Sequence, residues 1–211
     1  MRWDEGNFNF PRPVRSIVSL YHGKTLSFSL GTLRSGNTTY GMGPFQKPKT
    51  VKDAKSFFAF LKREGILLEE RTAFLRKKVE KELRRLGGDP ERCDPDLLRE
   101  VVNLVERPLI FSGSINRDYL KLPKEILIAS MAKYQRLFAV QDHHGKLIPH
   151  FVACANGSFV VAKVKKNYEH VLNARLKDAT FFYQEDMRQP LSQRREGLKL
   201  LPQNSLRTPW R

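Results

Sequence analysis

Residues 137–155 read LFAVQDHHGKLIPHFVACA. Two apolar runs, at 137–141 and 147–155, flank a polar segment that contains Gly145. Apolar runs joined by a short polar segment with a glycine are typical of two antiparallel strands and the turn between them. The sequence therefore predicts a hairpin near residues 136–155.

A second hairpin is predicted near residues 10–34. Two β-type runs, at 14–20 and 26–30, flank the turn residues His22-Gly23-Lys24. The polar, glycine-rich stretch that follows, residues 35–44, is predicted to be a loop.

Elsewhere the apolar residues return at intervals of three and four, which is the spacing of amphipathic helices. Stop and start signals agree with this period, since Gly65 and Gly87-Gly88 follow two of the segments and Asp94-Pro95 opens a third. Phe181 and Phe182 are assigned to the apolar face of the last helix. The predicted helices cover residues 51–64, 69–86, 95–107, 122–134 and 159–187, the last in one or two pieces.

The order of these elements indicates the fold class. Strands pair through short turns while helices come in separate groups, which favours an α+β fold with a mainly antiparallel sheet packed with amphipathic helices. We expect one domain over residues 1–198, with a helical sub-region at 50–106. Residues 199–211 have no periodicity and are expected to form a loose tail.

Composition narrows the class of protein. The chain has 211 residues, 40% of them hydrophobic, and charged residues interrupt every apolar run that could span a membrane. The N-terminus lacks the apolar segment of a secretory signal, so a cytoplasmic location is predicted. Cys93 and Cys154 lie far apart, and we expect both to be reduced thiols.

Charge points to the partner. Lys and Arg total 38 against 22 Asp and Glu, a net charge of +16. A field of this sign attracts polyanions, with nucleic acid the first candidate and an anionic membrane surface the second. The alternative is a basic helix face that is only solvated. The candidate phosphate contacts are Lys163, Lys165, Lys166, Arg175, Lys177, Arg188, Arg194 and Arg195 near the C-terminus, and Arg71, Lys78 and Arg85 in the helix near 69–86.

Catalytic and metal-binding patterns are weak by comparison. His143-His144 is a turn pair without a third residue at ligand spacing, and the adjacent acids Glu185-Asp186 face apart on a helix. The sequence contains neither of the glycine-rich phosphate-binding patterns G-x-G-x-x-G and G-x-x-x-x-G-K-[ST]. We therefore predict no catalytic residue, no metal ligand and no cofactor bound by this chain.

Five segments occur in the order found in one known family. They are Met1-Arg2-Trp3 with Phe10-Pro11-Arg12-Pro13-Val14-Arg15, then LREVVNLVERP at 98–108, LPKEIL to FAV at 122–140, GKLIPHF to AN at 145–156, and ARLKDA with FF and D at 174–186. Over about residues 1–200 the chain resembles an internal region of the beta subunit of the bacterial two-subunit glycyl-tRNA synthetase. The order of all five segments, more than any one of them, carries the resemblance.

The resemblance implies a function that composition does not. The family's enzyme is a heterotetramer of alpha and beta subunits, and its separate alpha subunit carries the class II site for glycine and for ATP with Mg. The beta subunit is longer than this chain and contributes to tRNA recognition. Glycine tRNA and the alpha subunit are therefore the implied partners, and no DNA is expected.

Two segments depart from the family pattern. Gly41 is followed by Met42-Gly43-Pro44-Phe45 in place of the family's GHRF, and the family's GNExV keeps only Glu169 and Val171. Two hypotheses follow for the chain: it helps to hold tRNA, or it is a structural and assembly module of the beta subunit without tRNA contact. A hydrolase acting alone would need a convergent set of titratable groups, of which the sequence gives no sign.

Overall fold

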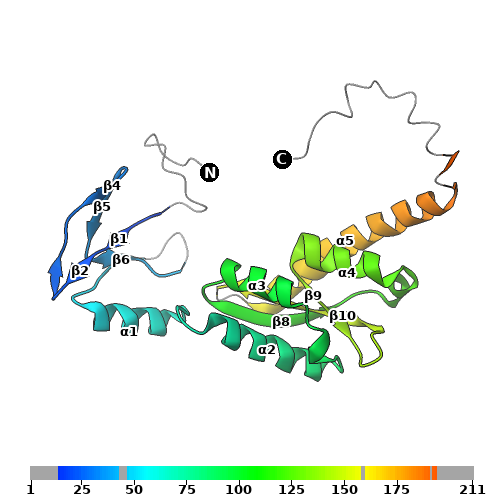
Figure 1. Cartoon of the computed structure of the whole chain (residues 1–211), viewed down its shortest axis with the longest axis horizontal. Coiled ribbons are helices and arrows are strands. Elements are labelled where there is room, and N and C mark those ends of the chain that lie inside the picture. Colours follow the sequence, from blue (N-terminus) through cyan, green and yellow to red (C-terminus); the bar gives the residue numbers. More distant parts are fainter. Residues whose placement is uncertain (1–13, 43–46, 158–159, 191, 194–211) are drawn as a thin grey trace, which may run out of the picture. The chain divides into compact units, whose positions relative to one another are not determined.

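The computed structural model of the chain describes residues 14–42, 47–157, 160–190 and 192–193. Among these residues lie α-helices and several small, mostly antiparallel sheets (Figure 1), so the predicted α+β class is confirmed. Within the described ranges, no helix combines the length and the apolar composition needed to cross a bilayer. The first 13 residues, Arg194, Arg195 and the predicted tail at 199–211 lie outside the described residues.

The chain divides into two compact units. The first takes its described residues from Met1–Leu75, Val102–Leu109 and Ala155–Ser158, and the second takes them from the remaining ranges. The sequence predicts a single domain over residues 1–198, whereas the structure contains two groups of segments that each pack among themselves. The extent of one folding domain stays a prediction.

Small sheets build the N-terminal part of the first unit. Only the part of the predicted hairpin next to its turn is present, as β2 (Leu20–Tyr21) and β3 (Lys24–Thr25), whose antiparallel pair is closed by His22 and Gly23 at positive φ. Residues 17–18 and 29–30 of the two predicted runs pair with residues 33–36 and not with each other. A separate sheet has the order β1-β5-β4 and includes a parallel pair. The strands not yet given bounds are β1 (Ile17–Val18), β4 (Ser29–Leu30), β5 (Leu33–Gly36), β6 (Thr38–Thr39) and β7 (Lys49–Thr50), of which the last two pair with each other.

The loop predicted at residues 35–44 is wrong in its first part, because β5 ends within it and β6 lies inside it. Ser35 shows why a polar residue is accepted there. Its buried hydroxyl donates to Leu26 O at 2.7 Å and accepts from Phe28 N at 2.8 Å, so the polar group is satisfied inside the sheet.

Helix α1 (Ala54–Glu64) follows these strands and begins and ends with strong capping signals. Asp53 accepts from Ser56 N at 2.7 Å, and Ser56 Oγ accepts from Asp53 N at 3.1 Å, which completes a capping box. Gly65 ends the helix at φ 71°, in the left-handed region that glycine adopts without strain. The predicted helix and its predicted stop are both confirmed.

The second unit is organised around a three-stranded sheet with the order β8-β10-β9. Its strands are β8 (Pro108–Ser114), β9 (Phe138–Gln141) and β10 (Leu147–Asn156). Strands β9 and β10 form the predicted hairpin, and Asp142 Oδ1 closes its turn by accepting from His144 N and Lys146 N, both at 2.9 Å. These backbone hydrogen bonds, the one from Lys146 first, hold the pKa of Asp142 below its ordinary value.

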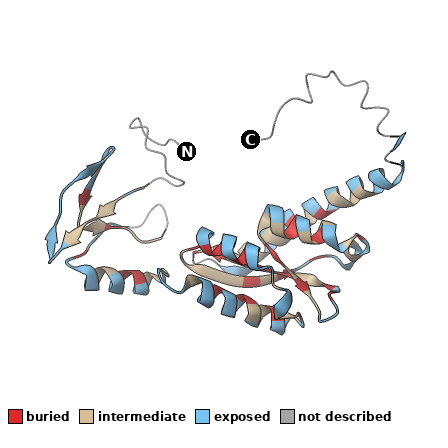
Figure 2. Cartoon of the chain, in the orientation of Figure 1, coloured by how far each residue is buried: buried red, intermediate tan, exposed pale blue. Residues whose placement is uncertain are grey.

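The predicted helices are confirmed around this sheet. They are α2 (Arg71–Arg85), α3 (Pro95–Leu104), α4 (Lys124–Gln135) and α5 (Val161–Met187). The last is one continuous helix. The apolar residues predicted for α2, such as Val79 and Leu83, are buried, and Figure 2 shows α2 and α5 exposed along their outer sides.

Gly113 in β8 is required by the ring of Phe151, which is fully buried in β10. A Cβ atom at position 113 would lie 2.2 Å from Cζ of Phe151, closer than any real contact. The pair therefore fixes the distance between β8 and β10 at this point.

Replacement of Gly113 tests this packing. We expect Gly113→Ala to lower the free energy of unfolding by about 1–3 kcal/mol, the usual cost of forcing extra volume into a packed core. Chemical denaturation measures the change. Gly36→Ala is the matched control, because the nearest atom to its added Cβ is 4.0 Å away, and it should cost much less. Equal effects of the two substitutions would contradict the packing argument.

Candidate nucleic-acid interface

Helix α5 carries a row of cations on its outer side. Leu172 and Leu176 are fully buried on the inner side of the helix. Positions 163, 166, 170, 177 and 188 follow one another at spacings of three, four, seven and eleven, so they share the opposite side. We call this set the basic face of α5: Lys163, Lys166, His170, Lys177 and Arg188, all of them exposed.

No acidic residue interrupts the basic face of α5 between Lys163 and Lys177, but Asp178 and Glu185 flank it near its distal end. The positions that fill the gaps along it are Ala174, Phe181 and Gln184. In the described part of the chain, no ion pair is recorded for the ammonium groups of Lys163, Lys166 or Lys177. Arg188, just beyond the end of α5, is different, because its guanidinium lies 2.6 Å from Glu185 Oε1. The lysines therefore keep their charge available to a polyanion.

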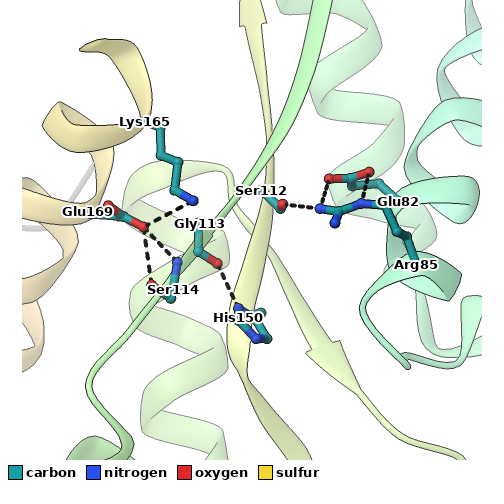
Figure 3. A network of polar contacts seen from close by, with 8 residues as sticks. All are labelled: Glu82, Arg85, Ser112, Gly113, Ser114, His150, Lys165 and Glu169. Carbon is teal, nitrogen blue, oxygen red and sulfur yellow. Dashed lines mark hydrogen bonds and ion pairs between the residues drawn. The ribbon is translucent and has the colours of Figure 1, made fainter. Parts of the chain in front are cut away.

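Lys165 does not belong to this face. It is half-buried, and its Nζ lies 3.8 Å from Glu169 Oε1 (Figure 3). The same carboxylate oxygen accepts from Ser114 N at 2.9 Å and from Ser114 Oγ at 3.3 Å. Glu169 therefore fastens α5 to the end of β8, and Lys165 is part of that fastening.

Arg175 is also engaged within the second unit. Its guanidinium carbon lies 5.8 Å from the centroid of the Tyr134 ring on α4, within the range of a cation–π contact. This places Arg175 on the side of α5 that meets α4, away from Lys163 and Lys177. The structure thus separates candidates that the sequence grouped together.

The candidate cations on α2 also differ in whether they make contacts within the fold. Arg85 donates to both carboxylate oxygens of Glu82, at 2.9 and 2.7 Å, and to Ser112 Oγ at 2.8 Å (Figure 3). The hydrogen bond from Arg85 holds the pKa of the Glu82 carboxyl below its ordinary value. Arg85 therefore serves the fold by tying α2 to β8. Arg71 is half-buried, Lys78 is exposed, and neither lies on the basic face of α5.

Four exposed cations on α2 are absent from the sequence-based candidates: Arg76, Lys77, Lys81 and Arg84. Lys77 and Lys81 are one helical turn apart, on the side opposite the buried Val79 and Leu83. The signal that identifies them is the helical period itself: once the buried stripe is assigned, the residues furthest from it are determined. The same reasoning selects Lys163, Lys166 and Lys177 on α5 and excludes Lys165.

The described part of the chain offers few groups for metal binding or nucleophilic catalysis. No group of three or more His, Cys, Asp or Glu residues there is arranged to hold a metal ion. Both cysteines are thiols, and burial raises the pKa of Cys93 to about 11 and that of Cys154 to about 12. Both thiols are therefore protonated near neutral pH and are poor nucleophiles.

Comparison with known proteins gives these surfaces a context. The family model described as glycyl-tRNA synthetase beta subunit matches residues 1–203. The chain belongs to this family. Among curated relatives, the glycine–tRNA ligase beta subunit of Clostridioides difficile is 42% identical over 204 residues, and that of Halothermothrix orenii is 37% identical over 203. Each alignment covers 94% of this chain but 29% of the relative, so the chain spans less than a third of the length of these relatives.

Membership of the glycyl-tRNA synthetase beta-subunit family confirms the resemblance seen in the sequence. The structure also explains one residue in a segment that departs from the family pattern. Glu169, which the chain retains there, is the residue that fastens α5 to Ser114. The other departure, after Gly41, falls largely on residues 43–46, which lie outside the described ranges.

Proposed function

We propose that this chain is a beta-subunit portion of glycine–tRNA ligase that helps to hold the tRNA while the separate alpha subunit joins glycine to it. Family membership supports the ligase assignment. The observation that carries the tRNA role is the basic face of α5, an exposed row in which Lys163, Lys166 and Lys177 make no ion pair with another described residue.

The proposed contact is electrostatic. Lysine ammonium groups bind phosphates as point charges, and a phosphate contact carries no sequence information, so this face would position the tRNA backbone and leave sequence recognition to other contacts. The net charge of +16 would also speed the encounter with a polyanion. Activation of glycine with ATP and Mg belongs, in this proposal, to the alpha subunit of a cytoplasmic heterotetramer.

A salt titration tests the proposal. If the four cations Lys163, Lys166, Lys177 and Arg188 each meet a phosphate, the logarithm of the affinity should fall with the logarithm of salt at a slope of about −3. Between about 50 and 200 mM salt this is a loss of about 60-fold. Filter binding of a glycine tRNA transcript measures it, with protein-free filters as the background control. An affinity that does not change with salt would overturn the tRNA role.

A second candidate function, assembly within the beta subunit without tRNA contact, is favoured by a feature of the first unit. A cleft of about 470 Å³ lies between α1 and the segment after it, lined by Phe58, Leu61, Ile66, Leu67 and Leu68 among others. Phe58 is 53% exposed and Leu68 is 48% exposed at its edge. Retention of the alpha subunit at high salt, together with no retention of tRNA, would favour assembly over tRNA binding.

A further inference from the structure

The outer side of α2 carries a second group of cations, centred on Lys81. The four residues one helical turn from Lys81 are Lys77, Lys78, Arg84 and Arg85, so every neighbour at a spacing of three or four is basic. All five side chains are exposed. We call this set the basic cluster of α2, and it lies wholly within the second unit.

Two acids flank the basic cluster of α2, and both are already paired. Glu80 lies 3.4 Å from the guanidinium of Arg84. Glu82 accepts from Arg85 at 2.9 and 2.7 Å (Figure 3). Residues 77–85 contain five cations and these two acids, so a net charge of +3 is left on this part of the helix.

Lys77 and Lys81 have no ion pair recorded in the described part of the chain. Glu80 lies one turn from Lys77, but its carboxylate is the one that pairs with Arg84. Like charges one turn apart destabilise a helix. Cations stabilise the C-terminal end of a helix through its dipole, but only within the last turn, which here holds Arg84 and Arg85. A bound anion would supply the compensation that the described fold does not give to Lys77.

We propose that the basic cluster of α2 is a second binding site for an RNA backbone, in which Lys77 and Lys81 each bind a phosphate. This inference rests on the proposed tRNA role and adds a surface to it. Figure 3 shows α2 and α5 reaching β8 from opposite sides, at Ser112 and Ser114. The basic cluster of α2 and the basic face of α5 would therefore meet different stretches of the RNA backbone.

The length and composition of the basic cluster of α2 favour a chain of phosphates as its ligand. Lys77 and Arg85 are eight residues apart, about 12 Å along the helix axis, which is longer than one phosphate group. Successive phosphates of a nucleic-acid strand supply negative charge along such a row. A protein partner would need an apolar centre to the contact, but the apolar side chains within residues 77–85, Val79 and Leu83, are buried.

Reversing the charge at Lys77 and Lys81 tests the site in the full chain. Filter binding of a glycine tRNA transcript at several salt concentrations compares Lys77→Glu, Lys81→Glu with the matched control Lys124→Glu, Lys133→Glu. The control lysines are exposed on α4 of the same unit, and both variants lose the same charge. Because all four positions are exposed, the substitutions should leave folding intact, which urea denaturation checks.

We expect the α2 variant to weaken tRNA binding by about 20-fold near physiological salt and to lower the steepness of the salt slope by about 1.4–1.8, the value for two phosphate contacts. A slope of about −3 accounts for the basic face of α5 alone, so the unaltered chain should show a steeper one. The α4 control should keep most of the affinity and the slope. Stability of the α2 variant should not fall, because Lys81→Glu places a carboxylate one turn from three cations.

Four results overturn the inference, and they differ in what they leave standing. Salt-dependent binding of the unaltered chain, with no response to Lys77→Glu, Lys81→Glu, removes the α2 site and leaves the tRNA role to α5. An equal loss in the α4 control assigns the effect to the overall charge. Displacement of tRNA by inorganic phosphate beyond the effect of sodium chloride at equal ionic strength indicates a site for a single anion. Failure of the unaltered chain to bind tRNA removes the proposed function together with the inference.

Discussion

Reversing the charge at Lys163, Lys166 and Lys177 is expected to weaken tRNA binding on the order of 100-fold near physiological salt. Each phosphate contact releases counterions, and losing one contact lowers the salt slope by about 0.7–0.9. The triple variant Lys163→Glu, Lys166→Glu, Lys177→Glu should therefore lower the affinity and also flatten the salt titration from a slope of about −3 to about −1. Filter binding with glycine tRNA measures both quantities.

If the net charge alone held the tRNA, removing any three cations would lower the affinity equally. The control variant must therefore lose the same amount of positive charge. The triple variant Lys24→Glu, Lys52→Glu, Lys55→Glu removes the same amount of positive charge from exposed positions of the first unit. If the basic face of α5 holds the tRNA, this control should keep most of the affinity and most of the slope. Equal losses in the two triple variants would show that the overall field binds tRNA, and the localised contact would be wrong.

Truncating Phe151 should have the largest effect on stability. The ring is fully buried in β10 and lies against Gly113. We expect Phe151→Ala to lower the free energy of unfolding by about 3–5 kcal/mol, since removing a buried ring loses its transfer free energy and leaves a cavity. The free energy of unfolding of a typical domain is about 5–15 kcal/mol, so this variant should leave the second unit close to unfolding. Denaturation by urea, followed by circular dichroism, measures the change.

The effects of Gly113→Ala and Phe151→Ala on the free energy of unfolding should not be additive. With the ring removed, the Cβ of Gly113→Ala gains space, so the double variant should be more stable than the sum of the single effects predicts. Phe58→Ala, which truncates a 53% exposed ring, should change stability by less than about 0.5 kcal/mol. Strict additivity in the double variant would show that the ring and the glycine do not constrain each other.

Much of the fold could be predicted from local pattern. The stripe with Val79 and Leu83, the stop at Gly65 and the turn around Asp142 are each encoded within a few neighbouring residues, and the structure confirms them. The first part of the predicted loop at 35–44 was wrong, because the burial of Ser35 depends on partners nine and seven residues away. The pattern of apolar and polar residues gives no information on such hydrogen-bond partners.

The division into two units illustrates the same limit at longer range. Asn156 Oδ1 accepts from the backbone N–H groups of Glu106 and Arg107, both at 3.0 Å, across about fifty residues of sequence. No periodicity links these positions. Local pattern therefore gives no information on which distant segments pack together, and the extent of one folding domain stays a prediction.

The candidate site was predicted in part. The sequence indicated that cations gather on α5, but it grouped Lys165 and Arg175 with Lys163 because all are basic and close in sequence. The structure separates them because Lys165 pairs with Glu169 and Arg175 contacts the ring of Tyr134. The exposure of Phe181 and Phe182 contradicts their assignment to the apolar face of the last helix. It could not be predicted either, because an aromatic at helical spacing fits a core as well as a surface, and only the extent of α4 decides between them.

The fastening of α5 at Glu169 has a consequence for the rest of that helix. A helical segment as short as the one beyond Leu176 would be marginal as a free peptide, because starting a helix is unfavourable. Here the turns packed beneath it serve as a ready nucleus, and each further residue only extends an existing ladder of hydrogen bonds. The far end should therefore behave as a tethered arm that frays from its tip, with its direction set at the anchored base.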